Sequence, residues 1–349
     1  MNTRLIGYLL YVCLLPLVMS RCTPNSERIL NTGIKRFEQG ETAKAITMIE
    51  KGIIDSVTIK HFSTTNLSCS NNLIYYRNND YLKIAYPHEM DIMINNNSIN
   101  LCYDPVLQRV GLLNGMNADI FNMKGALVKD VPLNQANGKE VKAIALLNDK
   151  LYYYCNRRIY FTGLHSNNAG RLVKDRFSPP FSPSLFYLVQ LQTNNNKLAI
   201  IVGIGGSYNM SVIDLSNSSI MLQNWKISSS KISFQEGYLY CITGSTGNWT
   251  LRRISIYTKK RNILLAFNNL IDLELTPSGI IYENNDGLWI MNYSNKRPVR
   301  LPFRFKLAGR YLEHLLIRND NGFYLIDMNK FLDIITYLNS KIPSLFEKK

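Results

Sequence analysis

The side chains that most often bind metals or perform catalysis are few and scattered in this sequence. Its histidines are separated by at least 27 residues, and none stands near a cysteine or an acid at the spacing of a metal site. Histidines placed in this way usually occupy the surface or a turn. We therefore identify no metal site and no catalytic residue among the four histidines, which are His61, His88, His165 and His314.

The acidic residues do not form a convincing catalytic pair either. A glycosidase needs two carboxylates that oppose each other across a cleft, whereas here acids occur in turns or as alternate residues, such as Glu89 with Asp91. The glycine-rich segment Val202–Ser207 is followed by a strand-like run instead of a helix, so it predicts a hairpin turn and not a phosphate loop. We expect no cofactor.

The net charge of the chain indicates which kinds of molecule it would bind. The formal net charge is +15, and such a surface attracts phospholipid head groups, acidic glycans or acidic proteins. Runs of cations such as Arg252-Arg253 and Lys259-Lys260-Arg261 are expected on solvated strand faces and turns. The densest stretch is predicted to be an anion-facing patch, and its cations are Lys296, Arg297, Arg300, Arg304, Lys306 and Arg310.

Residues 1–22 have the features of an export signal. The uncharged apolar run Leu5–Met19 follows one basic residue. At about 1.5 Å per residue the run is too short to span a bilayer as a helix, but it suits a signal peptide. It resembles the signal of a bacterial lipoprotein at residues 17–22, which implies a lipid on Cys22. Arg21 departs from that pattern, because a small residue is usual there. Cleavage after Ser20, before Arg21, and an uncleaved anchor stay open as alternatives.

Residues 23–55 predict a tether followed by two short helices. Apolar side chains recur at helical spacing in two segments on either side of Gly40. The segment resembles one tetratricopeptide repeat, with Gly33 and Ala45 at the small positions, although Arg36 stands where a tyrosine is usual. A single repeat cannot bury its own apolar face. The hairpin is therefore expected either to dock on the rest of the chain or to receive a helix from a partner.

Residues 56–349 repeat one strand-rich unit. An apolar-aromatic run, a polar turn and a second run recur with a period near 40 residues, which resembles the blades of a β-propeller. Seven first runs are visible, which predicts seven blades, with six or eight as alternatives; the runs centre on Tyr75, Leu113, Tyr152, Ala199, Tyr240, Tyr282 and Leu316. The segment Ser56–Phe62 is expected to pair with the last unit and complete it.

Export, an all-β repeat and the lack of a catalytic motif favour one function. We expect a non-catalytic binding or scaffolding module at the bacterial cell envelope, periplasmic or extracellular, whose propeller loops bind protein or glycan. An N-terminal lipid or signal anchor would hold it at a membrane. The alternative is a glycan- or peptide-acting propeller enzyme with a site at the central channel. Nucleic acid is not an expected partner, because no recognition motif is present.

Overall fold

The computed structural model describes residues 24–64, 66–70, 73–78, 81–94, 100–133, 140–165, 170–174, 188–194, 196–204, 207–235, 237–245, 247–276, 279–293, 297–311 and 314–346. Within these residues the strands form seven four-stranded antiparallel sheets, which are the blades of a seven-bladed β-propeller. The predicted fold class and blade number are confirmed. The chain divides into two compact units, described separately here: unit 1 comprises residues 1–65 and 270–349, and unit 2 comprises residues 66–269.

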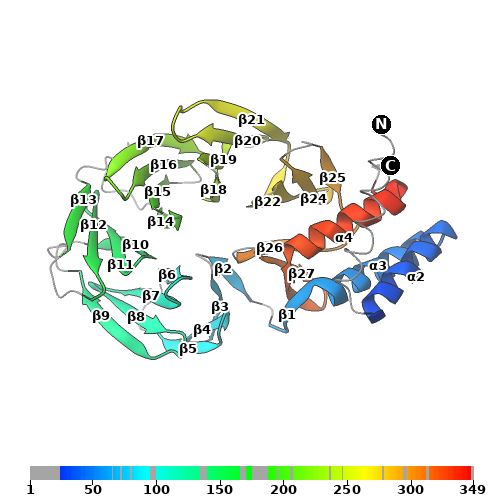
Figure 1. Cartoon of the computed structure of the whole chain (residues 1–349), viewed down its shortest axis with the longest axis horizontal. Coiled ribbons are helices and arrows are strands. Elements are labelled where there is room, and N and C mark those ends of the chain that lie inside the picture. The colour runs from blue at the N-terminus through cyan, green and yellow to red at the C-terminus, as the bar shows by residue number, and fades with distance from the viewer. Residues whose placement is uncertain are drawn as a thin grey trace, which may run out of the picture. The chain divides into compact units, whose positions relative to one another are not determined.

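Unit 2 contains blades 1 to 5, each made of four strands that are consecutive in the chain (Figure 1). Blade 1 consists of β2 (Ser68–Ser70), β3 (Leu73–Asn78), β4 (Tyr81–Tyr86) and β5 (Met90–Met93), and blade 2 of β6 (Leu101–Asp104), β7 (Arg109–Asn114), β8 (Asn117–Asn122) and β9 (Leu127–Pro132). Blade 3 consists of β10 (Val141–Leu147), β11 (Lys150–Cys155), β12 (Arg158–Gly163) and β13 (Arg171–Lys174).

Blades 4 and 5 follow the same plan with longer strands. Blade 4 consists of β14 (Leu188–Asn194), β15 (Lys197–Ile204), β16 (Ser207–Asp214) and β17 (Ser219–Ile227). Blade 5 consists of β18 (Ile232–Gln235), β19 (Tyr238–Ser245), β20 (Asn248–Ser255) and β21 (Arg261–Phe267). The glycine-rich segment Val202–Ser207 joins the paired strands β15 and β16, so it is the predicted hairpin connection.

Apolar side chains from consecutive blades form the cores of unit 2. Leu73 and Leu82 of blade 1 pack with Val110 and Leu112 of blade 2, and similar clusters join blades 2 and 3, 3 and 4, and 4 and 5. A side chain of this kind contributes about 1.5–3 kcal/mol when it is fully buried. Because blades 2, 3 and 4 bury both faces against their neighbours, the apolar runs lie in their two central strands, as the sequence repeat predicted.

Unit 1 contains blades 6 and 7. Blade 6 consists of β22 (Leu270–Leu275), β23 (Gly279–Asn284), β24 (Gly287–Asn292) and β25 (Pro298–Arg300). Blade 7 consists of β26 (Lys306–Tyr311), β27 (His314–Asn319) and β28 (Gly322–Asp327), completed by β1 (Thr58–Phe62). Strand β1 pairs antiparallel with β28, with Phe62 opposite Phe323. The predicted completion of the last unit by the N-terminal strand is confirmed.

The tight turns of blades 6 and 7 use the same chemistry. The side-chain oxygen of Asn284 accepts the backbone N–H of Asp286, and that of Asn319 accepts the N–H of Asn321, both at 2.9 Å. The following Gly287 has φ of 122°, in the region that glycine adopts without steric cost. The Asn, Asp and Gly residues at 284–287 and 319–322 therefore serve as structural turns.

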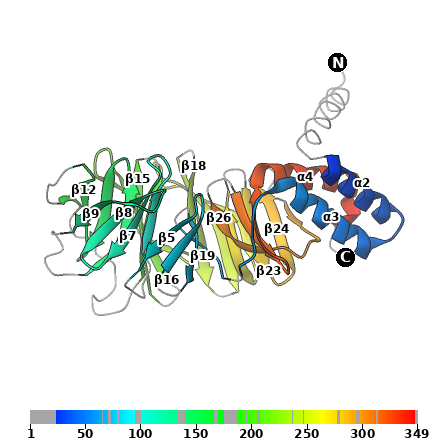
Figure 2. The ribbon, with the colours of Figure 1, turned by 90° about the horizontal axis from the view of Figure 1, so that it is seen from below.

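The predicted helical hairpin is present and belongs to unit 1. Helices α2 (Pro24–Glu38) and α3 (Thr42–Val57) lie beside the C-terminal helix α4 (Met328–Lys341) in both ribbon views (Figure 1, Figure 2). The 3-10 helix η2 (Pro343–Leu345) follows α4. One apolar cluster contains Ile49 of α3, Phe331 of α4 and Ile326 of β28. The hairpin is thus docked on its own chain, which was the first of the two expectations. Residues 331–339, whose apolar pattern suits a strand as well as a helix, lie within α4 and are helical.

The two hairpin helices approach closely at their glycines. A Cβ atom added at Gly33 would lie 2.7 Å from Cγ1 of Ile49. The side chain of Glu50 in α3 accepts the backbone N–H of Arg304. This hydrogen bond joins the hairpin to the connection between β25 and β26. No helix within the described part of the chain is long and apolar enough to cross a bilayer.

Candidate anion-binding edge on blade 5

The hairpin of β20 and β21 has an unusual charge. Between Asn248 and Phe267 the sequence has five cations and no acid. The longer segment 215–271 has only one acid, Glu236. Since β20 and β21 are the last two strands of their sheet, these cations belong to the outer hairpin of blade 5. We call them the blade 5 edge: Arg252, Arg253, Lys259, Lys260 and Arg261.

Two arginines of the blade 5 edge are stacked on aromatic rings. The guanidinium carbon of Arg261 lies 4.2 Å from the ring centroid of Trp225, and that of Arg253 lies 4.7 Å from the ring centroid of Tyr238. Stacking is worth about 0.5–1 kcal/mol at exposed sites. It also fixes the guanidinium plane, so that the N–H groups at its rim can donate hydrogen bonds to a carboxylate or a phosphate.

The strand register places these arginines on opposite faces of the hairpin. Arg253 is paired with Asn262 and Ile254 with Arg261, and residues directly opposite in an antiparallel pair share a face. Arg261 therefore shares its face with Ile254, which is buried in the core between blades 4 and 5, while Arg253 lies on the other face. When the Asn262 amide is oriented so that its oxygen and its nitrogen both form hydrogen bonds, the oxygen accepts from the Arg253 guanidinium at 3.2 Å.

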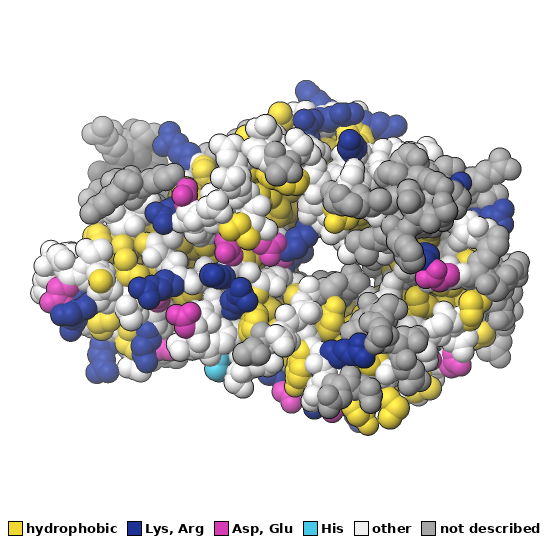
Figure 3. Space-filling model, turned by 180° about the vertical axis from the view of Figure 1, so that it is seen from behind, with side chains coloured by type: hydrophobic (Ala, Val, Ile, Leu, Met, Phe, Trp, Pro, Cys, Tyr) yellow, Lys and Arg dark blue, Asp and Glu magenta, His cyan; other side chains and the backbone are white. Residues whose placement is uncertain are grey.

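The lysines of the blade 5 edge lie in the turn that joins β20 and β21. The backbone N–H of Lys259 donates to the carbonyl of Ser255 at 2.8 Å, and both lysines are exposed. Tyr257 in the same turn is 69% exposed. In the space-filling view, Lys and Arg side chains gather along the upper edge of the molecule, where the ribbon view places β20 and β21 (Figure 3, Figure 1). The turn offers positive charge and an aromatic ring to solvent.

The patch predicted from the densest stretch of cations is spread over two sheets. Arg297 precedes β25 and Arg300 ends it, on the last strand of blade 6. Arg304 lies in the connection, whereas Lys306 and Arg310 belong to β26, the edge strand of blade 7. Arg300 donates through Nε to the carbonyl of Asp286 at 2.8 Å, and Arg310 donates to the carbonyl of Leu275. Lys296 lies outside the described residues.

The predicted processing site cannot be placed in the fold. Ser20, Arg21 and Cys22 all lie outside the described residues. Cys155 and Cys241 are buried on strands of blades 3 and 5. Burial raises the pKa of the Cys241 thiol to about 12. Cys155 and Cys241 therefore act as packing groups in the apolar clusters that contain them.

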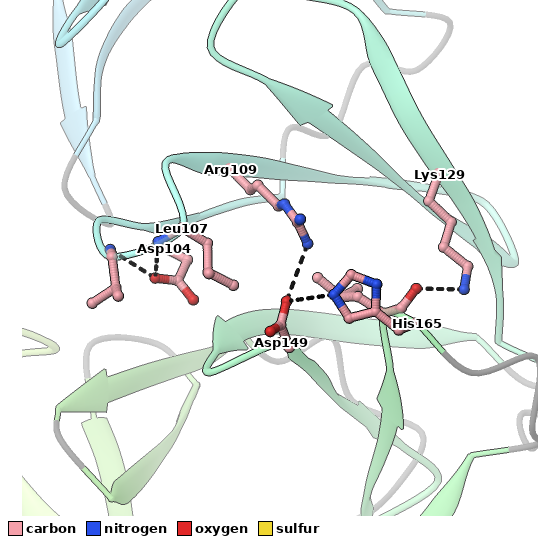
Figure 4. A network of polar contacts seen from close by, with 8 residues as sticks. Asp104, Leu107, Arg109, Lys129, Asp149 and His165 are labelled. Carbon is pink, nitrogen blue, oxygen red and sulfur yellow. Dashed lines mark hydrogen bonds and ion pairs between the residues drawn. The ribbon is translucent and has the colours of Figure 1, made fainter.

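His165 belongs to a polar network between blades 2 and 3 (Figure 4). Oδ1 of Asp149 accepts from the Arg109 guanidinium at 3.2 Å and lies 3.1 Å from Nε2 of His165. Asp149 stands in the β10–β11 turn with φ of 58°. Close by, Oδ1 of Asp104 accepts the backbone N–H groups of Val106 and Leu107 at 2.9 and 3.1 Å. The Arg109–Asp149 ion pair joins blade 2 to blade 3, so we interpret the network as a structural contact between blades.

Metal ligands do not gather in the described part of the chain. No three His, Cys, Asp or Glu side chains within it lie close enough to hold an ion. His61 is stacked on Tyr324, with ring centroids 4.6 Å apart, and His314 is stacked on Tyr311 at 6.2 Å. Each of these rings packs against a tyrosine of its own blade.

Sequence reasoning assigned the cations of the blade 5 edge to solvated faces and did not join them into a site. Arg252 and Lys259 belong to separate clusters in the sequence, and only the hairpin pairing of β20 with β21 brings the clusters to one edge. The signal that could have found the site is the lack of acids across segment 215–271.

The fold and this edge define a β-propeller with a candidate anion-binding surface. No protein-family model and no curated protein matches the sequence. Among solved structures, the chain is similar to an oligogalacturonate lyase in complex with manganese, with a TM-score of 0.50 and 10% identity over 78% of this chain and 90% of that one.

Two further structures are similar at lower scores. BBS1N in complex with ARL6DN has a TM-score of 0.48 and 12% identity, covering 77% of this chain and 95% of that one. The Pan2 WD40 domain of Neurospora crassa has a TM-score of 0.45 and 12% identity, covering 76% and 88%. At these identities the similarity concerns the propeller fold alone.

Proposed function

We propose that this chain is a non-catalytic binding or scaffolding module of the bacterial cell envelope, which binds an anionic protein or glycan through its propeller. The observation that carries the proposal is the blade 5 edge, which has five cations and no acid in one hairpin. Its stacked guanidiniums are held ready for a carboxylate or a phosphate before any ligand arrives, which lowers the entropy cost of binding.

The charge of the whole chain supports the same function. A net charge of +15 raises the encounter rate with anionic partners, and the attraction weakens with salt because the Debye length falls to about 8 Å at physiological ionic strength. The blade 5 edge would then select where the partner binds. This division of labour is common, since long-range charge sets the rate and local geometry sets the specificity.

The envelope location rests on the N-terminal sequence. The apolar run Leu5–Met19 followed by Cys22 supports export, with either a lipid on Cys22 or release after Ser20. Intact mass of the mature chain separates these routes, because lipidation leaves Cys22 as the acylated first residue. A mature parent chain whose mass includes no acyl group, or a Cys22→Ala variant that still fractionates with membranes, would contradict lipid anchoring.

Binding is tested with two polyanions of different backbone, polyglutamate and polygalacturonate, at about 50 mM salt. We expect the double variant Lys259→Glu with Lys260→Glu to weaken binding of the preferred polymer roughly tenfold. The control is Lys35→Glu with Lys124→Glu, which changes the net charge equally at exposed positions on α2 and blade 2. Equal loss in both double variants, or release of cleavage products from either polymer, would contradict the proposal.

A further inference from the structure

The last strand of blade 5 is less protected than the last strands of blades 1, 2, 3, 4 and 6. Proteins blunt such edges with short strands, prolines or bulges. Strands β5 and β13 have four residues each, and β9 ends in Pro132 while β25 begins with Pro298. Strand β17 has nine residues, but its pairing is interrupted at two places. Each of these strands is a poor template for another chain.

Strand β21 lacks most of these protections. It has seven residues, Arg-Asn-Ile-Leu-Leu-Ala-Phe, with no proline, and a single register shift beside Leu264. Strand β20 is its one sheet neighbour within the described residues. Ile263 in the middle of β21 is 59% exposed. A β-branched side chain exposed on a sheet edge is the feature that an added strand would cover.

The cations around β21 determine what kind of strand could be added. A second copy of this chain is itself strongly basic, so the blade 5 edge repels it. An acidic segment is attracted, and its side chains would alternate between the two faces of the sheet. Arg261 of β21 lies on one of these faces, and Arg253 of the neighbouring strand β20 lies on the other, so the hairpin presents an arginine on each face of the sheet. A ligand lying flat on one face would meet only one of them.

We propose that β21 accepts an extended acidic segment of a partner protein as a fifth strand of blade 5. This inference rests on the proposed function and makes it specific: the partner is a protein, and the contact is a backbone ladder flanked by ion pairs. The added strand would lie about 4.8 Å from β21. Main-chain hydrogen bonds would supply affinity, and Arg253, Lys259, Lys260 and Arg261 would select acidic sequences.

Hydrogen exchange of the full chain gives the direct test. The probe is the capped peptide Glu-Glu-Val-Val-Glu-Glu-Val, which as a strand has glutamates on both faces, and the comparison ligand is polygalacturonate. We expect the peptide to slow exchange of amides in residues 261–266, because strand addition pairs backbone groups that otherwise face solvent. Polygalacturonate, which has no amide ladder to offer, is expected to leave that exchange unchanged.

A second probe keeps the charge and removes the ladder. The same peptide with its inner amides N-methylated cannot pair through either edge, and we expect it to bind at least tenfold more weakly. Equal binding of both peptides, or unchanged exchange in β21 under saturating peptide, would overturn strand addition while leaving anion binding intact. Loss of binding to both peptides and to polygalacturonate would overturn the proposed function as well.

Discussion

The guanidinium of Arg261 lies over the indole ring of Trp225, 4.2 Å from its centroid, although the two residues belong to different blades. Trp225 is on the last strand of blade 4, and Arg261 begins the last strand of blade 5. The contact therefore joins neighbouring blades near their edges, beyond the apolar core between them. It also holds one cation of the blade 5 edge in a fixed direction.

This pair should contribute measurably to the stability of unit 2. In a double-mutant cycle of Trp225→Ala and Arg261→Ala, we expect a coupling energy of about 0.5–1 kcal/mol, the usual strength of an exposed cation–π contact. Urea unfolding of the four proteins measures it. Strict additivity of the two substitutions would show that the stacked geometry contributes nothing.

The carboxyl of Glu50 should make the stability of unit 1 depend on pH. Burial raises its pKa above the ordinary value of 4.5, and the hydrogen bond from the Arg304 backbone only partly opposes this. The folded chain therefore holds this proton more tightly than the unfolded chain, and stability is lost as pH rises from about 4.5 through the folded pKa.

The variant Glu50→Gln keeps an oxygen acceptor for the Arg304 N–H and removes the buried charge. We expect it to be more stable than the parent at neutral pH, with the difference shrinking as pH falls towards 4.5. Unfolding curves across this range provide the measurement. Glu38→Gln, at an exposed position of α2, is the control, and an equal gain from it would refute the explanation.

The ion network of Asp149 should respond to salt. Asp149→Asn removes the charge, while asparagine tolerates the positive φ of this turn. We expect a loss of about 0.5–1 kcal/mol at low salt, which fades near 1 M salt as surface ion pairs are screened. Asp130→Asn serves as control, because Asp130 contacts the neutral amide of Asn117. A loss for Asp149→Asn that does not change with salt would point to a steric cause.

The helix crossing at Gly52 should tolerate no larger side chain. An added Cβ would lie 2.7 Å from Cγ of Leu30, and overpacking of this kind costs about 1–3 kcal/mol. We expect Gly52→Ala to lower the unfolding midpoint of unit 1 in urea, although alanine favours a helix. The exposed neighbour Lys51→Ala gives the matched control. A stabilised Gly52→Ala protein would mean that the hairpin is packed more loosely than this.

The blades could be predicted from the sequence because all of them repeat the same local pattern of residues. Alternating apolar residues and Asn or Gly turns define the two central strands, and runs around Tyr152 and Tyr282 lie where expected in β11 and β23. Residues 331–339 could not be assigned in advance, since their isoleucines suit a strand as well as a helix. Packing against α3 of the hairpin stabilises the helical conformation of these residues. That contact joins segments that are far apart in the sequence.

The candidate site was much harder to predict. Density along the sequence drew attention to residues 296–310, but a blade boundary runs through that stretch and divides its cations between β25 and β26. The blade 5 edge depends on pairing across a hairpin, which brings Arg253 beside Asn262. A count of cations along the sequence cannot show such pairing. The scarcity of acidic residues in segment 215–271 would have indicated the same hairpin.

The pairing of β1 with β28 has a consequence for the order of synthesis. Unit 2 is one uninterrupted stretch, residues 66–269, whereas unit 1 is built from both termini. A nascent chain can complete the five blades of unit 2 before β28, the strand that pairs with residues 58–62, has been synthesised. A chain that ends early, before residue 322, would leave an apolar hairpin and an open strand exposed, which marks it for chaperones and proteases.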